Sequence, residues 1–238
     1  MTGGDGLILD GVSAGYGETI VLERIAFELP PGGTLALLGR NGVGKTTLLA
    51  TIIGQTRLRV GSIRFAGREI CGAPSYQVAQ AGIGLVPEGR QVFPNLTVRE
   101  NLVATAANRG DAAAPWTLAR VLELFPALRQ RLGHLGHQLS GGEQQMLAVG
   151  RALMTNPKLL ILDEACEGLA PLVRQEIWSC LARLKALGQA ILVIDKNLDA
   201  LTRIADRHYI IERGRVVWAG GSKELAAAPD IQHRYLGV

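Results

Sequence analysis

The sequence predicts an α/β fold: a mostly parallel sheet with helices, preceded by an N-terminal antiparallel β subdomain and interrupted by a helical insertion. Apolar runs at 34–38, 159–162 and 190–194 have the length and composition of buried strands. Residues 7–29 contain alternating apolar stretches separated by turn signals, which is typical of antiparallel strands. In residues 88–137 apolar side chains recur with a period near 3.6 residues, which indicates a mostly helical segment.

The composition indicates a soluble, cytosolic protein with a single domain over residues 1–238. Of its 238 residues 47% are apolar, and no run approaches the roughly 20 apolar residues of a membrane helix. We expect no signal peptide, because the first residues are neither basic nor apolar. The three cysteines are odd in number and widely spaced, which favours reduced thiols. The net charge of +4 comes from scattered Lys and Arg, so we expect no nucleic-acid partner.

A glycine-rich loop, Gly39-Arg40-Asn41-Gly42-Val43-Gly44-Lys45-Thr46, fits the pattern G-x-x-x-x-G-K-[ST] at every fixed position. It lies between the strand expected at 34–38 and a helix expected at 47–53, which is the context of a phosphate cradle. The glycines let backbone N–H groups point at phosphate oxygens, and the helix presents its free N-terminal donors. Lys45 can then reach the β- and γ-phosphates, and the Thr46 hydroxyl can hold Mg²⁺. A plain turn with a solvated lysine does not account for this context, so the loop predicts a P-loop NTPase core that binds nucleotide.

Tyr16 lies between Gly15 and Gly17, in the N-terminal antiparallel region, and allows two interpretations. It is either a turn aromatic that covers the edge of the sheet or a platform on which an adenine ring stacks. These residues alone do not choose between the two.

The segment after the P-loop contains further short elements and then the helical insertion. We expect a strand and turn at 61–72, a helix at 75–80, a strand at 83–86 and an exposed loop at 88–91. Thr97 and Glu100 form a capping box that begins a helix to about residue 106. A linker at 108–115 and helices at 116–125 and 127–132 complete a helical subdomain of about 88–137.

The stretch Leu139-Ser140-Gly141-Gly142-Glu143 opens another expected helix, which continues over 146–153. Ser140 and Glu143 form a capping box, which by itself explains both residues. It does not explain two adjacent glycines in the first turn, where each costs up to about 1 kcal/mol of helix stability. Glycines there are useful when something approaches the backbone closely, and a helix N-terminus with a serine suits an anion. We therefore interpret the stretch as a phosphate-binding segment.

The apolar strand that begins at Lys158 ends in two adjacent carboxylates, Asp163 and Glu164. The simpler interpretation is solubilising charge at the end of a strand. Beside a P-loop, however, Asp163 is expected to bind Mg²⁺, directly or through water, and Glu164 to orient or deprotonate the attacking water. Side chains alternate across a strand, so the two carboxylates can take different roles.

The C-terminal part contains a further buried strand, a hairpin and a tail. The strand at 190–194 is followed by Asp195, Lys196 and Asn197. Residues 209–212 and 216–219 flank Arg213-Gly214-Arg215, which is a hairpin signal. One or two short helices are expected over 222–238.

In this order and spacing, the P-loop, Leu-Ser-Gly-Gly-Glu and the strand ending in Asp-Glu resemble the ATP-binding cassette (ABC) ATPases. The resemblance covers essentially the whole chain, and Leu-Ser-Gly-Gly-Glu is the discriminating motif, since other P-loop proteins lack it. Finer matches resemble the ATP-binding subunits of bacterial importers of branched-chain, or hydrophobic, amino acids. They are the stretch 38–45, Val86-Pro87-Glu88-Gly89-Arg90-Gln91-Val92-Phe93-Pro94, 143–148 and Glu167-Gly168-Leu169-Ala170-Pro171. Urea and amide importers have closely similar subunits.

The resemblance implies a role for each matching residue. Tyr16 would stack on adenine, and Ser140, Gly141 and Gly142 would form the signature that contacts nucleotide. Glu88 stands where most ABC ATPases have a glutamine that contacts Mg²⁺ and the attacking water. Asp163 would be the metal-side carboxylate, with Thr46 and Glu88, and Glu164 the catalytic one. The phosphate-binding set would be Gly39, Arg40, Asn41, Gly42, Val43, Gly44, Lys45, Thr46 and Thr47.

Three departures from the family pattern concern the ends of the two last parallel strands. Ala165-Cys166 replaces Pro followed by Ser, Thr or Leu, and Ala170 stands where many cassettes carry a dimer-contacting aspartate. Lys196 takes the position of the switch histidine, which normally reaches the γ-phosphate. A lysine can still reach a phosphate as a point charge, but it cannot accept a hydrogen bond from the attacking water. We expect Lys196 to act in catalysis; a solvated lysine is the alternative.

The expected partners follow from the motifs and the resemblance. One chain has one P-loop and one signature, and the signature cannot usefully cap a γ-phosphate enclosed on its own side. We therefore expect a homo- or heterodimer with a second ABC ATPase subunit, held by ATP and released when the γ-phosphate is lost. The resemblance implies Mg²⁺, two transmembrane permease subunits that dock near 88–97, a periplasmic solute-binding protein, and a peripheral place on the cytoplasmic face of the inner membrane.

The expected function is ATP hydrolysis that drives uptake of branched-chain or hydrophobic amino acids. The same role in a urea or amide importer stays open. Two other classes also stay open: a soluble ABC ATPase acting on nucleic acid or ribosomes, and a nucleotide-binding regulatory module without turnover.

Overall fold

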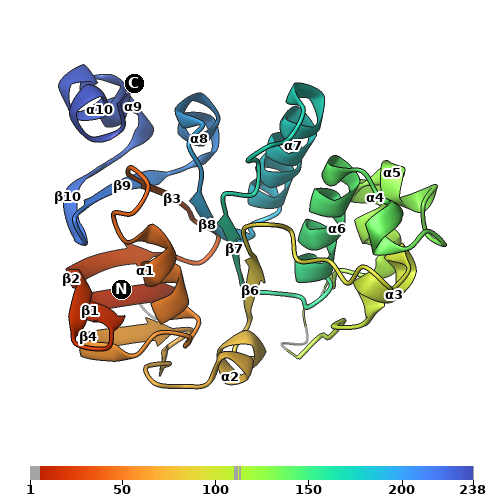
Figure 1. The fold of residues 1–238 in the computed structure, drawn as a ribbon, viewed down its shortest axis with the longest axis horizontal. Helices are drawn as coiled ribbons and strands as arrows, with labels where there is room; N and C mark the ends of the chain where they lie inside the picture. Colours follow the sequence, from red (N-terminus) through yellow and green to blue (C-terminus); the bar gives the residue numbers. More distant parts are fainter. Residues whose placement is uncertain (1–5, 110–111, 113, 238) are drawn as a thin grey trace.

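The computed structural model describes residues 6–109, 112 and 114–237, whose strands form two sheets (Figure 1). The smaller sheet is antiparallel, with the order β2-β1-β4-β5. Its strands are β1 (Leu7–Tyr16), β2 (Thr19–Leu29), β4 (Leu58–Phe65) and β5 (Arg68–Glu69). The N-terminal antiparallel strands are thus confirmed, and β4 begins three residues earlier than expected.

The larger sheet has the order β10-β9-β3-β8-β7-β6, and every neighbouring pair except β9–β10 is parallel. The strands are β3 (Thr34–Leu38), β6 (Ile83–Val86), β7 (Leu159–Asp163), β8 (Ala190–Ile194), β9 (Arg207–Glu212) and β10 (Arg215–Gly220). The antiparallel pair is the expected hairpin. Its two turn residues, Arg213 and Gly214, have φ of 48° and 75°, the left-handed conformation that a two-residue hairpin turn needs.

Two apolar cores lie on opposite faces of the larger sheet. In β3, Leu35 and Leu37 pack in one core, whereas Ala36 and Leu38 pack in the other, because side chains alternate along a strand. The first core also contains α1 (Lys45–Ile52) and the smaller sheet. The second contains α6 (Gly141–Leu153), α7 (Pro171–Ala186) and α8 (Leu198–Ile204). The helix after the P-loop and the helix after Ser140 therefore cover opposite faces, and Figure 1 shows them on either side of β6–β8.

The helical segment between β6 and β7 contains shorter helices than expected. They are α3 (Val98–Val103), α4 (Leu118–Leu124), α5 (Pro126–Arg129) and a 3₁₀ turn (Gly136–Gln138). The capping box is confirmed, since the Glu100 N–H donates to the Thr97 hydroxyl at 3.2 Å and the Thr97 N–H donates to the Glu100 carboxylate at 2.7 Å. The expected extension of this helix to residue 106 is wrong, because the chain turns away to donate the Ala107 N–H to the Met154 carbonyl. Part of the linker expected at 108–115 lies outside the described residues.

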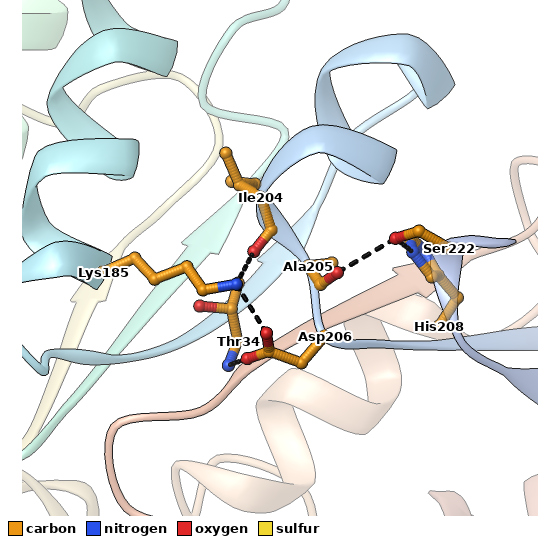
Figure 2. A network of polar contacts seen from close by, with 7 residues as sticks. All are labelled: Thr34, Lys185, Ile204, Ala205, Asp206, His208 and Ser222. Atoms are coloured by element: carbon orange, nitrogen blue, oxygen red, sulfur yellow. Dashed lines mark hydrogen bonds and ion pairs between the residues drawn. The ribbon is translucent and has the colours of Figure 1, made fainter.

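The remaining helices are α2 (Ser75–Gln80), as expected, and two in the tail, α9 (Ser222–Ala226) and α10 (Pro229–Tyr235). A polar network joins this tail to the larger sheet (Figure 2). The Asp206 carboxylate accepts hydrogen bonds from the Thr34 N–H at 2.8 Å and from Lys185 Nζ at 2.5 Å. His208 Nε2 lies 2.8 Å from the Ser222 hydroxyl, which donates to the Ala205 carbonyl. The network therefore holds together the start of β3, the end of α7, the start of β9 and the start of α9.

Candidate nucleotide-binding and hydrolysis site

The P-loop has the backbone geometry that a phosphate cradle requires. The loop connects β3 to α1, which begins at Lys45, two residues before the expected start. Gly39, Gly42 and Gly44 have φ of 141°, 78° and 112°, in the left-handed region that favours glycine. A Cβ on Gly39 would lie 2.4 Å from the Ile211 carbonyl oxygen of the neighbouring strand. The backbone conformation therefore favours glycine at all three positions, and at Gly39 the neighbouring strand also leaves no room for a side chain.

Lys45 is held inside this loop. Its Nζ donates to the carbonyl oxygens of Gly39 at 2.7 Å and Arg40 at 2.9 Å, and the side chain is only 7% exposed. Burial lowers the pKa of Lys45, and the nearby carboxylates of Glu164 and Asp163 oppose this effect. A largely buried ammonium that lies against the backbone of this loop is suited to bind an anion held by the loop.

The two threonines after Lys45 differ. Thr46 is exposed at the first turn of α1, where its hydroxyl is accessible to a ligand. Thr47 is buried, and its carbonyl accepts a hydrogen bond from the Thr51 hydroxyl. The geometry favours Thr46 over Thr47 as a ligand of a bound cation.

Asp163 and Glu164 are the two carboxylates at the end of β7. Asp163 is buried at the last residue of the strand, and its pKa is raised by burial and by the negative charge of Glu88. Glu164 leaves the strand direction with a φ of 47°, and its N–H donates to the Ile194 carbonyl at 2.9 Å. Its pKa is also raised, by burial first and then by Glu167. Each carboxylate is partly desolvated and lies near another acidic side chain, so a bound cation or proton would stabilise it.

A cluster of carboxylates lies beside Glu164. One oxygen each of Glu88, Glu164 and Glu167 lie within 4.8 Å of one another. Lys196 Nζ lies 2.7 Å from Glu167 Oε1 and 3.5 Å from Glu164 Oε2. In the structure Lys196 thus contacts carboxylates. Glu167 was missing from the predicted site residues, although it begins the Glu167–Pro171 match.

The signature stretch is built as a helix start, as predicted. Ser140 caps α6: the Glu143 N–H donates to the Ser140 hydroxyl at 3.3 Å, and the Ser140 N–H donates to the Glu143 carboxylate at 2.8 Å. The two glycines also have close protein neighbours. A Cβ on Gly142 would lie 2.7 Å from the Val173 side chain of α7, and one on Gly141 would lie 2.9 Å from the Arg90 guanidinium. Packing within the chain is therefore a second reason for having glycine at these two positions, besides the approach of an anion.

Tyr16 stands at the end of β1 and is 55% exposed. Its hydroxyl accepts a hydrogen bond from the Thr56 hydroxyl at 3.3 Å. An exposed ring whose hydroxyl is hydrogen-bonded is compatible with base stacking and equally with covering the edge of the sheet.

The structure brings most of the predicted residues to one edge of the larger sheet and leaves the signature elsewhere. The P-loop follows β3, Asp163 ends β7, Lys196 follows β8 and Glu88 follows β6, and all four strands are parallel neighbours. By contrast, α6 packs against α3, α5, α7 and β6, on the face opposite α1. One chain therefore supplies a phosphate cradle with its carboxylates and, separately, an exposed Ser140 at a helix start.

Comparison with known proteins identifies the family. The sequence profile of the ABC transporter family matches residues 22–167. The chain is 41% identical over 231 residues to the high-affinity branched-chain amino acid transport ATP-binding protein BraG of Pseudomonas aeruginosa, covering 97% of this chain and 99% of the relative. It is 32% identical to a probable branched-chain amino acid transport ATP-binding protein, LivF, of Archaeoglobus fulgidus, covering 95% and 97%.

Solved structures agree. A nucleotide-free ATP-binding cassette from an ABC transporter superimposes with a TM-score of 0.83 at 26% identity, over 95% of both chains. The ATP-binding subunit of another ABC transporter superimposes with a TM-score of 0.82 at 29% identity, over 97% of this chain and 96% of that one. The strand–loop–helix cradle, the carboxylates beside it and these similarities lead to one conclusion: the chain belongs to the ABC transporter family, as an ATP-binding subunit that hydrolyses ATP.

Proposed function

We propose that the chain hydrolyses Mg·ATP to drive uptake of branched-chain or hydrophobic amino acids through partner permease subunits. The observation that carries this proposal is the 41% identity to BraG over nearly the full length of both chains, and the presence of Lys45, Asp163 and Glu164 supports it. The same role in a urea or amide importer is the second candidate. Relatives near 30% identity include the lipopolysaccharide export protein LptB of Haemophilus influenzae, so similarity at that level does not select a solute.

The residues of the site fit Mg²⁺. The Thr46 hydroxyl is exposed at the start of α1, and Asp163 is a buried carboxylate with Glu88 near enough to raise its pKa. Hydroxyl and carboxylate oxygens are the ligands that Mg²⁺ prefers, and a cation there would offset the desolvated negative charge. We assign Thr46, Asp163 and Glu88 to the metal, which when bound neutralises charge on the β- and γ-phosphates.

The other roles follow from position. Lys45 would bind the β- and γ-phosphates, together with the N–H groups of residues 39–47. Glu164 would accept the proton of the attacking water, because it directly follows Asp163 but lies just beyond the end of β7. Tyr16 would stack on the adenine ring.

The second half of the nucleotide site would come from another ABC ATPase subunit. Ser140, Gly141 and Gly142 lie at the start of α6, across the sheet from the P-loop helix α1. We therefore assign this segment to the nucleotide bound by a partner subunit, identical or different. ATP would then hold two subunits together, and hydrolysis would release them.

The force of that closure would act on another protein. Among the described residues, no helix has both the length and the apolar character needed to cross a bilayer. A groove of about 610 Å³ runs between α2, β6, α6 and the segment after α3, with the exposed rings of Tyr76 and Phe93 in its wall. We assign this groove to a cytoplasmic loop of a permease subunit. The chain would then lie on the cytoplasmic face of the inner membrane. A solute-binding protein would act from the periplasmic side.

The test is reconstitution. The chain is assayed for ATP hydrolysis alone and in proteoliposomes with candidate permease subunits of an amino-acid importer or a urea or amide importer, and uptake of leucine, urea and acetamide is followed. We expect slow hydrolysis alone, faster hydrolysis with the permease, and uptake of leucine. Uptake of urea or acetamide alone would favour the second candidate. Equal hydrolysis rates with and without the permease would contradict the transport role and favour a soluble ABC ATPase.

A further inference from the structure

The ammonium of Lys196 lies against the carboxylates of the catalytic site. Glu167 lies in the turn after β7, and Lys196 lies in the turn after β8. These strands are parallel neighbours, so the two turns lie side by side and together line a pocket of about 510 Å³. The Lys196 ammonium is 2.7 Å from Glu167 and 3.5 Å from Glu164.

The distances show which carboxylate holds Lys196 more closely. A separation of 2.7 Å is a short charge-assisted hydrogen bond, whereas 3.5 Å is an ion pair at longer range. Glu167 therefore fixes the position of the Lys196 ammonium, and Glu164 interacts with it only at the longer distance. The ammonium of Lys45, by contrast, donates to two P-loop carbonyls.

The γ-phosphate of ATP would compete with Glu167 for this ammonium. The P-loop, the Lys196 turn and the Glu164 turn follow three adjacent strands, β3, β8 and β7. A second, smaller pocket, of about 260 Å³, is lined by Gly39, Arg40 and Asn41 of the P-loop together with Lys196. Lys196 thus borders both the carboxylates on one side and the P-loop on the other, on a long flexible side chain that can reach either.

We propose that Glu167 is a positioning residue that holds Lys196 on the carboxylate side of the site until a γ-phosphate takes the ammonium over. ADP has no γ-phosphate and leaves the Glu167–Lys196 pair intact. ATP must break the pair, so Glu167 lowers the affinity for ATP relative to ADP. In the empty or ADP-bound subunit, Lys196 therefore stays paired with Glu167.

The expected effect is small and specific. Both side chains are about half exposed, at 51% for Glu167 and 52% for Lys196. An exposed ion pair shifts an equilibrium by at most about five-fold. Removing Glu167 should therefore tighten binding of a nucleotide with a γ-phosphate by about two- to five-fold.

The experiment measures Mg²⁺-dependent binding of AMP-PNP and of ADP to dilute full-length protein by titration calorimetry. Glu167→Gln is expected to tighten AMP-PNP binding by about two- to five-fold and to leave ADP binding unchanged. The tightening should disappear when Lys196→Gln is also present, and Glu167→Asp should restore part of the wild-type behaviour. Glu176→Gln, which removes an exposed carboxylate from α7, controls for net charge.

Three results would overturn the proposal: equal tightening of ADP and AMP-PNP, unchanged or weaker AMP-PNP binding, or an effect that persists undiminished with Lys196→Gln. The proposal rests on the proposed function only in that the P-loop binds ATP. It needs no permease and no particular solute. A lack of stimulation by the permease would contradict the proposed function and leave these affinities as a separate result.

Discussion

Replacing Glu164 with Gln tests the catalytic assignment with very little structural disturbance. The amide has the shape of the carboxylate, and the backbone contact that fixes the residue, from its N–H to the Ile194 carbonyl at 2.9 Å, is unchanged. The side chain loses its charge, its 3.5 Å ion pair with Lys196 and its ability to accept a proton. Lys196 keeps its closer partner, Glu167, at 2.7 Å.

The magnitudes separate catalysis from stability. A positioned general base contributes about 10²- to 10⁴-fold to a rate, so turnover should fall at least about 100-fold. The free energy of unfolding should change by less than about 1 kcal/mol, because the lost ion pair involves a half-exposed lysine. ATP binding should persist, because Lys45 and the P-loop backbone are untouched. ATP that binds without being hydrolysed should trap a dimer.

The assays are phosphate release at saturating Mg·ATP, thermal unfolding, and gel filtration with light scattering in the presence of ATP. Glu176→Gln, with the same change of charge on exposed α7, is expected to hydrolyse ATP at the wild-type rate. If Glu164→Gln keeps more than about a tenth of the wild-type rate, Glu164 is not the general base.

Three further predictions concern other parts of the chain. Ser140→Arg should leave ATP affinity of the dilute subunit almost unchanged and abolish ATP-driven dimerisation, as measured by titration and light scattering; loss of affinity in the dilute subunit would mean that the signature acts on its own nucleotide. Lys196→Glu adds a further carboxylate beside Glu164 and Glu167 and should weaken ATP binding by about ten-fold or more and slow turnover; unchanged ATP affinity would show that Lys196 is only surface charge. Burial lowers the pKa of His208 to about 4, below its ordinary value of 6.5, so the folded chain keeps this imidazole neutral. The resulting stability is present above pH 6.5 and is lost as the pH falls toward 4, by about 2 kcal/mol between pH 7 and pH 5; urea unfolding at the two pH values should show this loss in the wild type and a smaller one in His208→Gln.

The central strands β3, β7 and β8 of the larger sheet were predictable because both of their faces are buried. All five residues of 34–38 and of 190–194 are buried, so the sequence shows unbroken apolar runs. The P-loop and the capping box at Thr97 were predictable for another reason: each depends on contacts within a few residues of chain. Contacts between residues that are close in the chain can be predicted from the sequence alone.

The ends of the helices in 88–137 were not predictable from local chemistry. The chain leaves α3 because the Ala107 N–H bonds to the Met154 carbonyl, and Asn156 bonds to the backbone of both Ala107 and Trp116. Those partners belong to the end of α6 and the loop after it. The helix α7 is a different case, since its buried residues Ile177, Cys180, Leu181 and Leu184 follow helical spacing. The sequence therefore contains the signal for this helix.

The contact between Lys196 and Glu167 depends on strand order, which no motif contains. The two residues are brought together only because β8 lies beside β7 in the sheet. The same order, β3-β8-β7-β6, places the P-loop, Lys196, Asp163 and Glu88 one after another along the edge where parallel strands end. Each site residue was therefore predictable from its motif, whereas the side chain that it contacts in the folded chain was not. Lys196 was expected to face a phosphate, and in the chain by itself it is held by two carboxylates, so any role at the phosphate requires that it first be released.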